Sequence, residues 1–398
     1  GRGDNKTNLA FLHERQTKTG QIAPDDAIVL HPFGRHCVGY KSAGEIDVLE
    51  AIDHVCTQYN IDRRRIVLMG FSMGGAGCWH LGAHYADRFV AMSPGAGFAE
   101  TARYQRLEPD DVPWYKRKLW GVYDVPCYTR NLFNLPAIAY SGELDKQIQA
   151  ARVMEEAFAA EGENLPHLIG PGMGHKYHPA TLKEILRRLK AARDVGLETN
   201  PQRVELQTRT LRYNKLHWVE VVGMAEHWRD TRVSARRVNE GTLELTTKNV
   251  TALHLSPPDV GKIETLTIDG QQIKPTLYEI DDQPARIPLV QVDGRWECSP
   301  TERNALVKRP GLQGPIDDAF LEPFLIVLPS GECRHPAVER WVAFESQRCI
   351  ERWKALFRGA PRVKRDIDVT AEDVAKYHLI LWGDPQSNTI IRRLADWG

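Results

Sequence analysis

Three residues able to carry out covalent attack on a carbonyl group occur in this chain in the order Ser72, Asp145, His175. Ser72 lies in the pattern G-x-S-x-G, at residues 70–74. A serine hydroxyl is a weak nucleophile at neutral pH, so it needs a base in hydrogen-bond reach and an acid that orients the base. We therefore predict Ser72 as nucleophile, His175 as general base and Asp145 as the acid.

The elements around Ser72 are those that such a nucleophile requires. The apolar run Ile66–Met69 predicts a buried strand, and residues 76–84 can continue as a helix. Strand, G-x-S-x-G and helix form the nucleophile elbow of α/β-hydrolases, a turn so sharp that glycine is needed beside the serine. The helix N-terminus then lies beside the developing oxyanion.

Each of the other two residues follows a predicted strand of its own. Asp145 comes after the strand at residues 137–140, with Glu143 as a rival acid nearer the strand end. His175 closes a glycine-rich loop after the short strand at 167–169, and His178 is the competing base. The sequence leaves both alternatives open.

An oxyanion hole requires two backbone N–H donors. Met73, directly after Ser72, is expected to supply one of them. The opening segment Gly1-Arg2-Gly3-Asp4 looks like the loop that supplies the other, with its preceding strand absent. On that interpretation the Arg2 N–H is the second donor; the alternative is an ordinary chain terminus.

The first half of the chain, residues 1–197, alternates predicted strands and helices, which is typical of a doubly wound, mostly parallel sheet. We expect strands at 27–30, 66–69, 89–92, 137–140 and 167–169, and helices near 43–56, 76–84, 149–160 and 180–193. Residues 98–134 interrupt this alternation and predict an inserted cap. Its aromatic side chains either form a substrate-binding wall or pack the insertion itself; the candidates for the wall are Trp114, Trp120 and Tyr123.

Residues 200–398 have a different character. Short runs rich in β-branched residues between 204 and 292 favour a β-sandwich-like accessory region. After Pro315 a mixed α/β pattern returns, with a strand at 324–328, a helix near 337–357 and a further strand at 379–383.

Composition narrows the function classes. The 398 residues carry no formal net charge, and hydrophobic residues make up 42% of them, which favours neither nucleic acid nor an anionic membrane as a partner. The chain has seven cysteines, an odd number, and no C-x-x-C pair. This pattern argues against a zinc site and against a dense disulfide framework. We expect no metal and no organic cofactor. Localisation stays open; an upstream signal peptide would make the protein secreted or periplasmic.

With these residues assembled, residues 1–195 resemble the catalytic domain of the prolyl oligopeptidase family, in its esterase-like branch without a propeller. The similarity rests on Tyr59–Asp62, on the elbow at 70–75, on Ser141–Asp145 and on Gly174-His175. The resemblance implies an α/β-hydrolase fold and the roles given above for Ser72, Asp145 and His175. Two departures put a proline-specific endopeptidase in doubt, namely the missing propeller and the missing opening strands.

Three functions compete. The first is a serine hydrolase that cleaves a small-molecule ester or peptide through an acyl-enzyme; in its esterase form it would act on plant-polymer or polyester acyl groups, as feruloyl and acetylxylan esterases do. The second is a non-catalytic binding protein on a hydrolase fold. The third makes the β-rich half a carbohydrate-binding module, with Trp218, Trp228 and Trp296 as a platform unless they are core residues.

Overall fold

The structure is a computed structural model that describes residues 7–35, 38–279, 284–300, 307–357 and 359–396. The chain divides into two compact units, one formed mainly by Val48–Gln313 and one mainly by Gly314–Gly398. The sequence-predicted division at residues 197–200 falls inside the first unit and stays a prediction.

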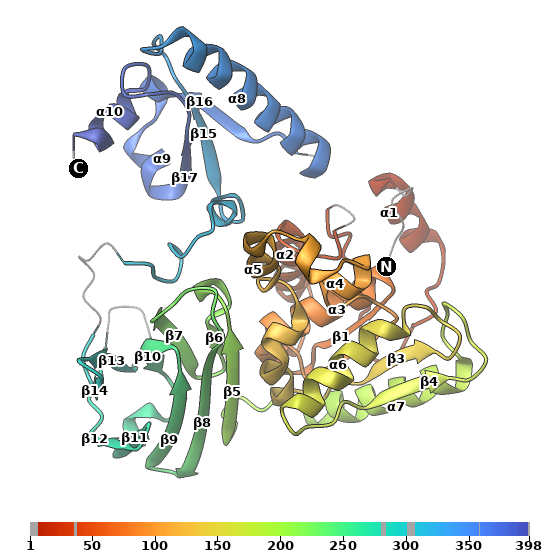
Figure 1. Ribbon diagram of the computed structural model, residues 1–398. Helices are drawn as coiled ribbons and strands as arrows, with labels where there is room; N and C mark the ends of the chain where they lie inside the picture. Colours follow the sequence, from red (N-terminus) through yellow and green to blue (C-terminus); the bar gives the residue numbers. More distant parts are fainter. Residues whose placement is uncertain (1–6, 36–37, 280–283, 301–306, 358, 397–398) are drawn as a thin grey trace. The chain divides into compact units, whose positions relative to one another are not determined.

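The first part of the larger unit is a parallel four-stranded sheet in the order β1-β2-β3-β4 (Figure 1). Its strands are β1 (Val67–Phe71), β2 (Ala91–Gly95), β3 (Ala139–Gly142) and β4 (His167–Gly170). Helices α3 (Met73–His84) and α6 (Ile148–Ala160) pack on one face of the sheet, and α7 (Pro179–Val195) packs on the other. Successive strand residues point to opposite faces, so Leu68 joins the first core and Met69 the second. This is the predicted α/β-hydrolase fold.

One predicted strand is wrong. Residues 27–30 form no strand, and Ile28 is 54% exposed. Strands of a parallel sheet are held by a hydrogen-bonded neighbour. Among the described residues nothing pairs with the outer edge of β1, so the 27–30 run has no sheet to join. Helices α1 (Asn8–Thr17) and α2 (Ala43–Gln58) precede β1.

The described residues between 203 and 297 form the predicted β-sandwich-like region. Two five-stranded sheets have the orders β14-β13-β10-β7-β6 and β12-β11-β9-β8-β5. The strands of this region are β5 (Arg203–Thr208), β6 (Lys215–Leu216), β7 (Val219–Met224), β8 (Thr231–Asn239), β9 (Thr242–Lys248), β10 (Val250–Leu255), β11 (Thr265–Ile268), β12 (Gln271–Ile273), β13 (Ile287–Val292) and β14 (Arg295–Glu297). Along β8 buried and less buried residues alternate, as expected of a strand with one face on a core. Trp218 and Trp296 are 2% and 3% exposed, which contradicts their use as a binding platform and makes them core residues.

The edge strand β5 of this sandwich is covered by the 3₁₀ segment η4 (Val125–Asn134), which ends the cap insertion. The Asn134 side chain donates to the Glu205 carbonyl and accepts from the Glu205 N–H, at 2.9 and 3.0 Å. Asn131 accepts from the Gln207 N–H at 2.7 Å. Exposed strand edges promote unwanted pairing between chains. Here two side-chain amides take the place of a neighbouring strand.

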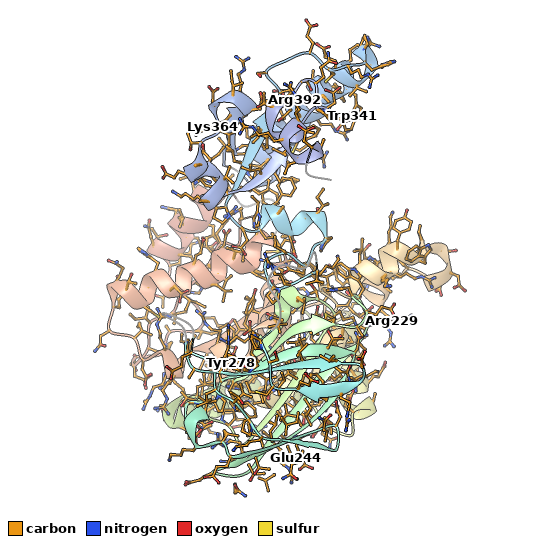
Figure 2. All side chains as sticks on the ribbon, turned by 90° about the vertical axis from the view of Figure 1, so that its left-hand side faces the viewer. Arg229, Glu244, Tyr278, Trp341, Lys364 and Arg392 are labelled. Atoms are coloured by element: carbon orange, nitrogen blue, oxygen red, sulfur yellow. The ribbon has the colours of Figure 1, made fainter. Side chains whose placement is uncertain are left out.

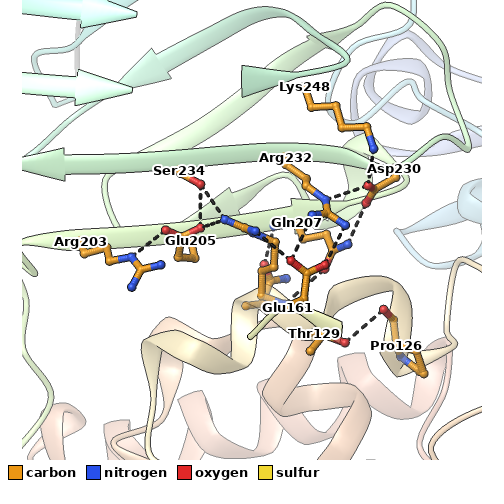
Figure 3. Close-up of polar contacts among 12 residues, drawn as sticks. Pro126, Thr129, Glu161, Arg203, Glu205, Gln207, Asp230, Arg232, Ser234 and Lys248 are labelled. Atoms are coloured by element: carbon orange, nitrogen blue, oxygen red, sulfur yellow. Dashed lines mark hydrogen bonds and ion pairs between the residues drawn. The ribbon is translucent and has the colours of Figure 1, made fainter. Parts of the chain in front are cut away.

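Charged side chains reinforce the contact between η4 and β5, which we call the seam (Figure 3). Arg130 pairs with Glu205 and, at 3.0 Å, with Glu161 at the end of α6. Arg232 of β8 bonds to Glu161 at 2.8 Å and to Asp230 at 2.7 Å. The network ties α6, η4 and two sandwich strands together, so the sandwich is built onto the hydrolase sheet within one unit.

The smaller unit contains a three-stranded parallel sheet, in the order β16-β15-β17, with a long helix α8. Its elements are β15 (Phe324–Leu328), α8 (Pro336–Phe357), β16 (Arg362–Arg365), α9 (Ala371–Lys376), β17 (His378–Leu381) and α10 (Thr389–Ala395). Trp341, labelled in Figure 2, lies on α8 and is 58% exposed. This is the mixed α/β pattern that the sequence predicts after Pro315.

Within the described residues, no helix has the length and apolar character needed to cross a membrane. Six of the seven cysteines lie in the described part of the chain, and all six are free thiols.

Candidate active site

The turn after β1 has the strained geometry of a nucleophile elbow. Ser72 has φ 56° and ψ −120°, a region that a residue with a side chain rarely adopts. Its backbone N–H donates to the Gly95 carbonyl at 2.8 Å, which fixes the turn to β2. A Cβ atom at Gly70 would lie 1.9 Å from the Gly74 oxygen, so the chain can turn here only because residue 70 is glycine. The hydroxyl-bearing residue is half-buried.

The loops after β3 and β4 bring an acid and a base together. The Nδ1 atom of His175 lies 2.8 Å from Oδ2 of Asp145. The Asp145 side chain is 4% exposed and its Oδ1 accepts from the Gln147 N–H at 2.9 Å, whereas the His175 side chain is 45% exposed. A carboxylate fixed in this way orients the ring and leaves Nε2 for another partner. The two loops can approach this closely because residue 142 is glycine. A Cβ atom there would lie 2.2 Å from the Gly174 oxygen.

The two rival residues have other contacts. Glu143 is exposed and its carboxylate accepts from the Gly172 N–H at 2.7 Å, which holds the histidine loop by its backbone. His178 is the N-cap of α7, and its Nδ1 lies 3.1 Å from the Thr181 hydroxyl. The structure thus places His175, and not His178, beside the buried Asp145.

An aromatic cluster that the sequence analysis did not single out supports the histidine loop. The ring of His175 lies 4.9 Å from that of Phe71, the residue before Ser72, which places the base next to the elbow. Tyr177 packs on Phe71 and Tyr140 at 4.7 and 4.6 Å. The Tyr140 hydroxyl donates to the Lys176 carbonyl and accepts from the His178 N–H, both at 2.8 Å. The sequence signal for this cluster is the position of Tyr140, which lies in the strand that leads to Asp145.

Of the two predicted oxyanion donors, Met73 and Arg2, the structure describes only Met73. Met73 is the first residue of α3, and the first N–H groups of a helix have no partner within it. Its N–H is thus suited to meet a negative charge at the helix start. Arg2 lies outside the described residues, so its assignment stays a prediction.

The cap insertion is closed at its base by a narrow neck. The Val125 N–H donates to the Ala99 carbonyl at 2.9 Å, and the Thr101 hydroxyl donates to Oδ1 of Asp124 at 2.7 Å. Burial raises the pKa of Asp124 to about 6, although the Thr101 hydrogen bond and the nearby Lys41 oppose the rise. A half-buried carboxyl therefore joins the two ends of the cap.

The three aromatic residues predicted to line the pocket differ in their exposure and contacts. Trp114 opens α5 (Trp114–Trp120) and is 68% exposed, while Trp120 at the other end is half-buried. Tyr123 lies inward, with its ring 5.8 Å from that of His84 on α3 and 6.3 Å from that of Tyr213 in the sandwich region. The role of these three side chains in substrate binding stays a prediction.

Sequence comparison finds that part of this chain is similar to a known family. Residues 39–191 match the model of the prolyl oligopeptidase family. A curated relative, an uncharacterized secreted protein of Arthroderma benhamiae, is 22% identical over 299 residues, which is 69% of this chain and 31% of the relative. The chain thus spans about a third of that relative's length.

Solved structures with partial similarity include both esterases and peptidases. S-formylglutathione hydrolase of Staphylococcus aureus is 19% identical with a TM-score of 0.28, covering 37% of this chain and 60% of its own. A puromycin-hydrolysing peptidase of Mycobacterium tuberculosis is 15% identical with a TM-score of 0.32, covering 39% of this chain and 26% of its own. Neither similarity assigns a substrate to this chain. Residues 39–191 combine a parallel sheet, a strained serine turn and a match to the family model, and in these features they resemble a hydrolase domain of the prolyl oligopeptidase family.

Proposed function

We propose that this protein is a serine hydrolase that cleaves an ester or peptide bond through an acyl-enzyme. Ser72 attacks the carbonyl carbon while His175 takes the hydroxyl proton, and the tetrahedral oxyanion is stabilised by the Met73 N–H. His175 then returns the proton to the leaving group. Water, deprotonated by His175, hydrolyses the acyl-enzyme and restores Ser72.

The observation that carries the proposal is the pairing of His175 with the buried Asp145 beside a strained serine turn. The Asp145 side chain is only 4% exposed, so this pair differs from the exposed ion pairs of a protein surface, which contribute little to stability. The buried Asp145 stabilises the imidazolium that forms when His175 accepts a proton.

The substrate is proposed as a small ester or a peptide, with the esterase form acting on acyl groups of plant polymers or polyesters. The family match supports hydrolysis and is compatible with either bond. We further propose that the protein acts outside the cytoplasm, because the curated relative from Arthroderma benhamiae is described as secreted.

Labelling with a fluorophosphonate tests the nucleophile. We expect one label per chain, located on Ser72 by peptide mass spectrometry, and none in the Ser72→Ala variant. Ser299→Ala, a matched change at a serine remote in sequence, should label normally. Labelling that survives Ser72→Ala would refute the assignment, and a folded protein that never labels would favour the non-catalytic binding protein.

Rates on p-nitrophenyl esters and on Xaa-Pro anilides separate the two bond types. An esterase would hydrolyse the esters at least a hundredfold faster than the anilides, and the Ser72→Ala variant would lose both activities. Faster cleavage of the anilides would assign the protein to the peptidases.

A further inference from the structure

Helix α5 exposes large apolar side chains among consecutive cations. Its sequence is Trp-Tyr-Lys-Arg-Lys-Leu-Trp. Trp114, Tyr115 and Leu119 are 68%, 50% and 46% exposed. Exposed aromatic residues gathered on one short element mark a binding surface more often than isolated ones do. We call this surface, formed by residues 114–119, the α5 platform.

Aromatic and cationic side chains share the same sides of the helix. Residues three and four positions apart are neighbours on a helix surface. Arg117 and Lys118 are therefore the neighbours of Trp114, and Leu119 is the neighbour of Tyr115. The exposed indole is flanked by two positive charges and is not separated from them.

The two flanking cations are only weakly engaged. Arg117 lies 3.9 Å from Asp110, whose side chain is fully exposed. Lys118 lies 3.9 Å from Glu226, which already accepts from Nε of Arg229 at 2.8 Å (Arg229 is labelled in Figure 2). Exposed ion pairs of this length contribute little, so both cations can exchange their partner for an anionic ligand.

We propose that the α5 platform binds a carboxylate-bearing polysaccharide, that is, a chain of uronic acid sugars. The polarised C–H groups on one face of a pyranose ring meet the negative face of the Trp114 indole. The ring carboxylate then pairs with Arg117, whose planar guanidinium matches it, and with Lys118. This inference rests on the proposed hydrolase function and names its substrate class, an ester carried by an acidic glycan, because the platform belongs to the cap inserted between β2 and β3.

The arrangement does not suit a lipid bilayer. A helix that lies in a membrane surface needs an apolar face separated from its charged face and enough length to bury it. Helix α5 has seven residues, and its cations stand between its aromatic residues. Binding to anionic vesicles is therefore the alternative that the experiment must exclude.

Binding is measured on the Ser72→Ala background, so that no turnover occurs. Isothermal titration with oligogalacturonate is compared with a neutral galactan oligomer of the same length and with polyaspartate. We expect oligogalacturonate to bind at least tenfold more tightly than either. Equal binding of polyaspartate, or binding of vesicles with 30% phosphatidylserine in place of the glycan, would overturn the proposal.

Two variants assign the binding to α5. Trp114→Ala and the double variant Arg117→Gln, Lys118→Gln should each weaken oligogalacturonate binding about tenfold or more. Matched changes elsewhere, Tyr59→Ala and the double variant Lys183→Gln, Lys274→Gln, should leave it unchanged. Unchanged binding in both α5 variants would refute the platform. Fluorophosphonate labelling of the same changes in a chain with Ser72 reports on the hydrolase separately, so loss of labelling and loss of glycan binding are distinguishable.

Discussion

Replacing Asp124 at the neck of the cap should make the protein more stable at neutral pH. The carboxyl group is half-buried and accepts a hydrogen bond from the Thr101 hydroxyl at 2.7 Å. Asparagine keeps an oxygen that can accept this hydrogen bond and removes the partly desolvated charge. The variant is therefore a direct measure of what ionising Asp124 costs.

The magnitude follows from the pKa. Burial raises the pKa of Asp124 from an ordinary value of 3.8 to about 6 in the folded protein. A difference of roughly 2 pH units corresponds to about 3 kcal/mol. Because the folded pKa is the higher one, the protonated carboxyl favours folding below about pH 4, and this advantage is lost as the pH rises through about 6. Above that value the wild-type protein bears the full cost and Asp124→Asn does not.

Urea unfolding followed by tryptophan fluorescence at pH 4.5, 6 and 8 checks the reasoning. We expect Asp124→Asn to exceed the wild type by about 2–3 kcal/mol in free energy of unfolding at pH 8, with the difference shrinking toward pH 4.5. Asp111→Asn, the same charge change at an exposed position of the cap, should show no such trend. A variant less stable than the wild type at pH 8, or a difference independent of pH, would refute the account.

Three further predictions concern the site and the seam. Asp145→Asn should lower kcat by on the order of 10⁴-fold while the protein stays folded, because the histidine loses its orienting acid; steady-state kinetics with circular dichroism test this, and a loss below tenfold would contradict it. Gly70→Ala should abolish fluorophosphonate labelling, since the added Cβ would lie 1.9 Å from the Gly74 oxygen, and normal labelling would disprove the tight turn. Asn134→Ala should destabilise the larger unit by about 2–4 kcal/mol, because it leaves the Glu205 backbone unpaired, whereas exposed Asn60→Ala should have little effect in the same urea titration.

Local sequence carries most of the information about the candidate site. Ser72, Asp145 and His175 each follow their own strand, and the order of strands in a parallel sheet brings the three turns to one edge. The choice between Asp145 and Glu143 could not be made from spacing, because both lie in the same turn. It depends on which carboxylate is buried against the histidine loop.

The features that sequence reasoning missed depend on contacts between distant segments. The amides of Asn131 and Asn134 meet strand β5 more than 70 positions along the chain. Nothing in their local pattern distinguishes them from asparagines of an ordinary turn. The strand predicted at 27–30 is wrong because a distant contact is lacking. An apolar run becomes a strand only where a neighbouring strand offers hydrogen bonds.

The neck and the seam divide the cap into two parts with different freedom to change. Residues 100–124 leave and re-enter the domain at one point, where the Val125 N–H meets the Ala99 carbonyl. This excursion, which carries α5, touches the sandwich through side chains, with Lys118 3.9 Å from Glu226 and the Tyr123 ring 6.3 Å from that of Tyr213, so it can be exchanged as a cassette if these contacts are matched. Residues 125–134 cannot, because they complete the β5 edge. Natural variation in substrate preference should therefore concentrate before Val125, and chimeric enzymes with new preferences should be joined at Ala99 and Val125.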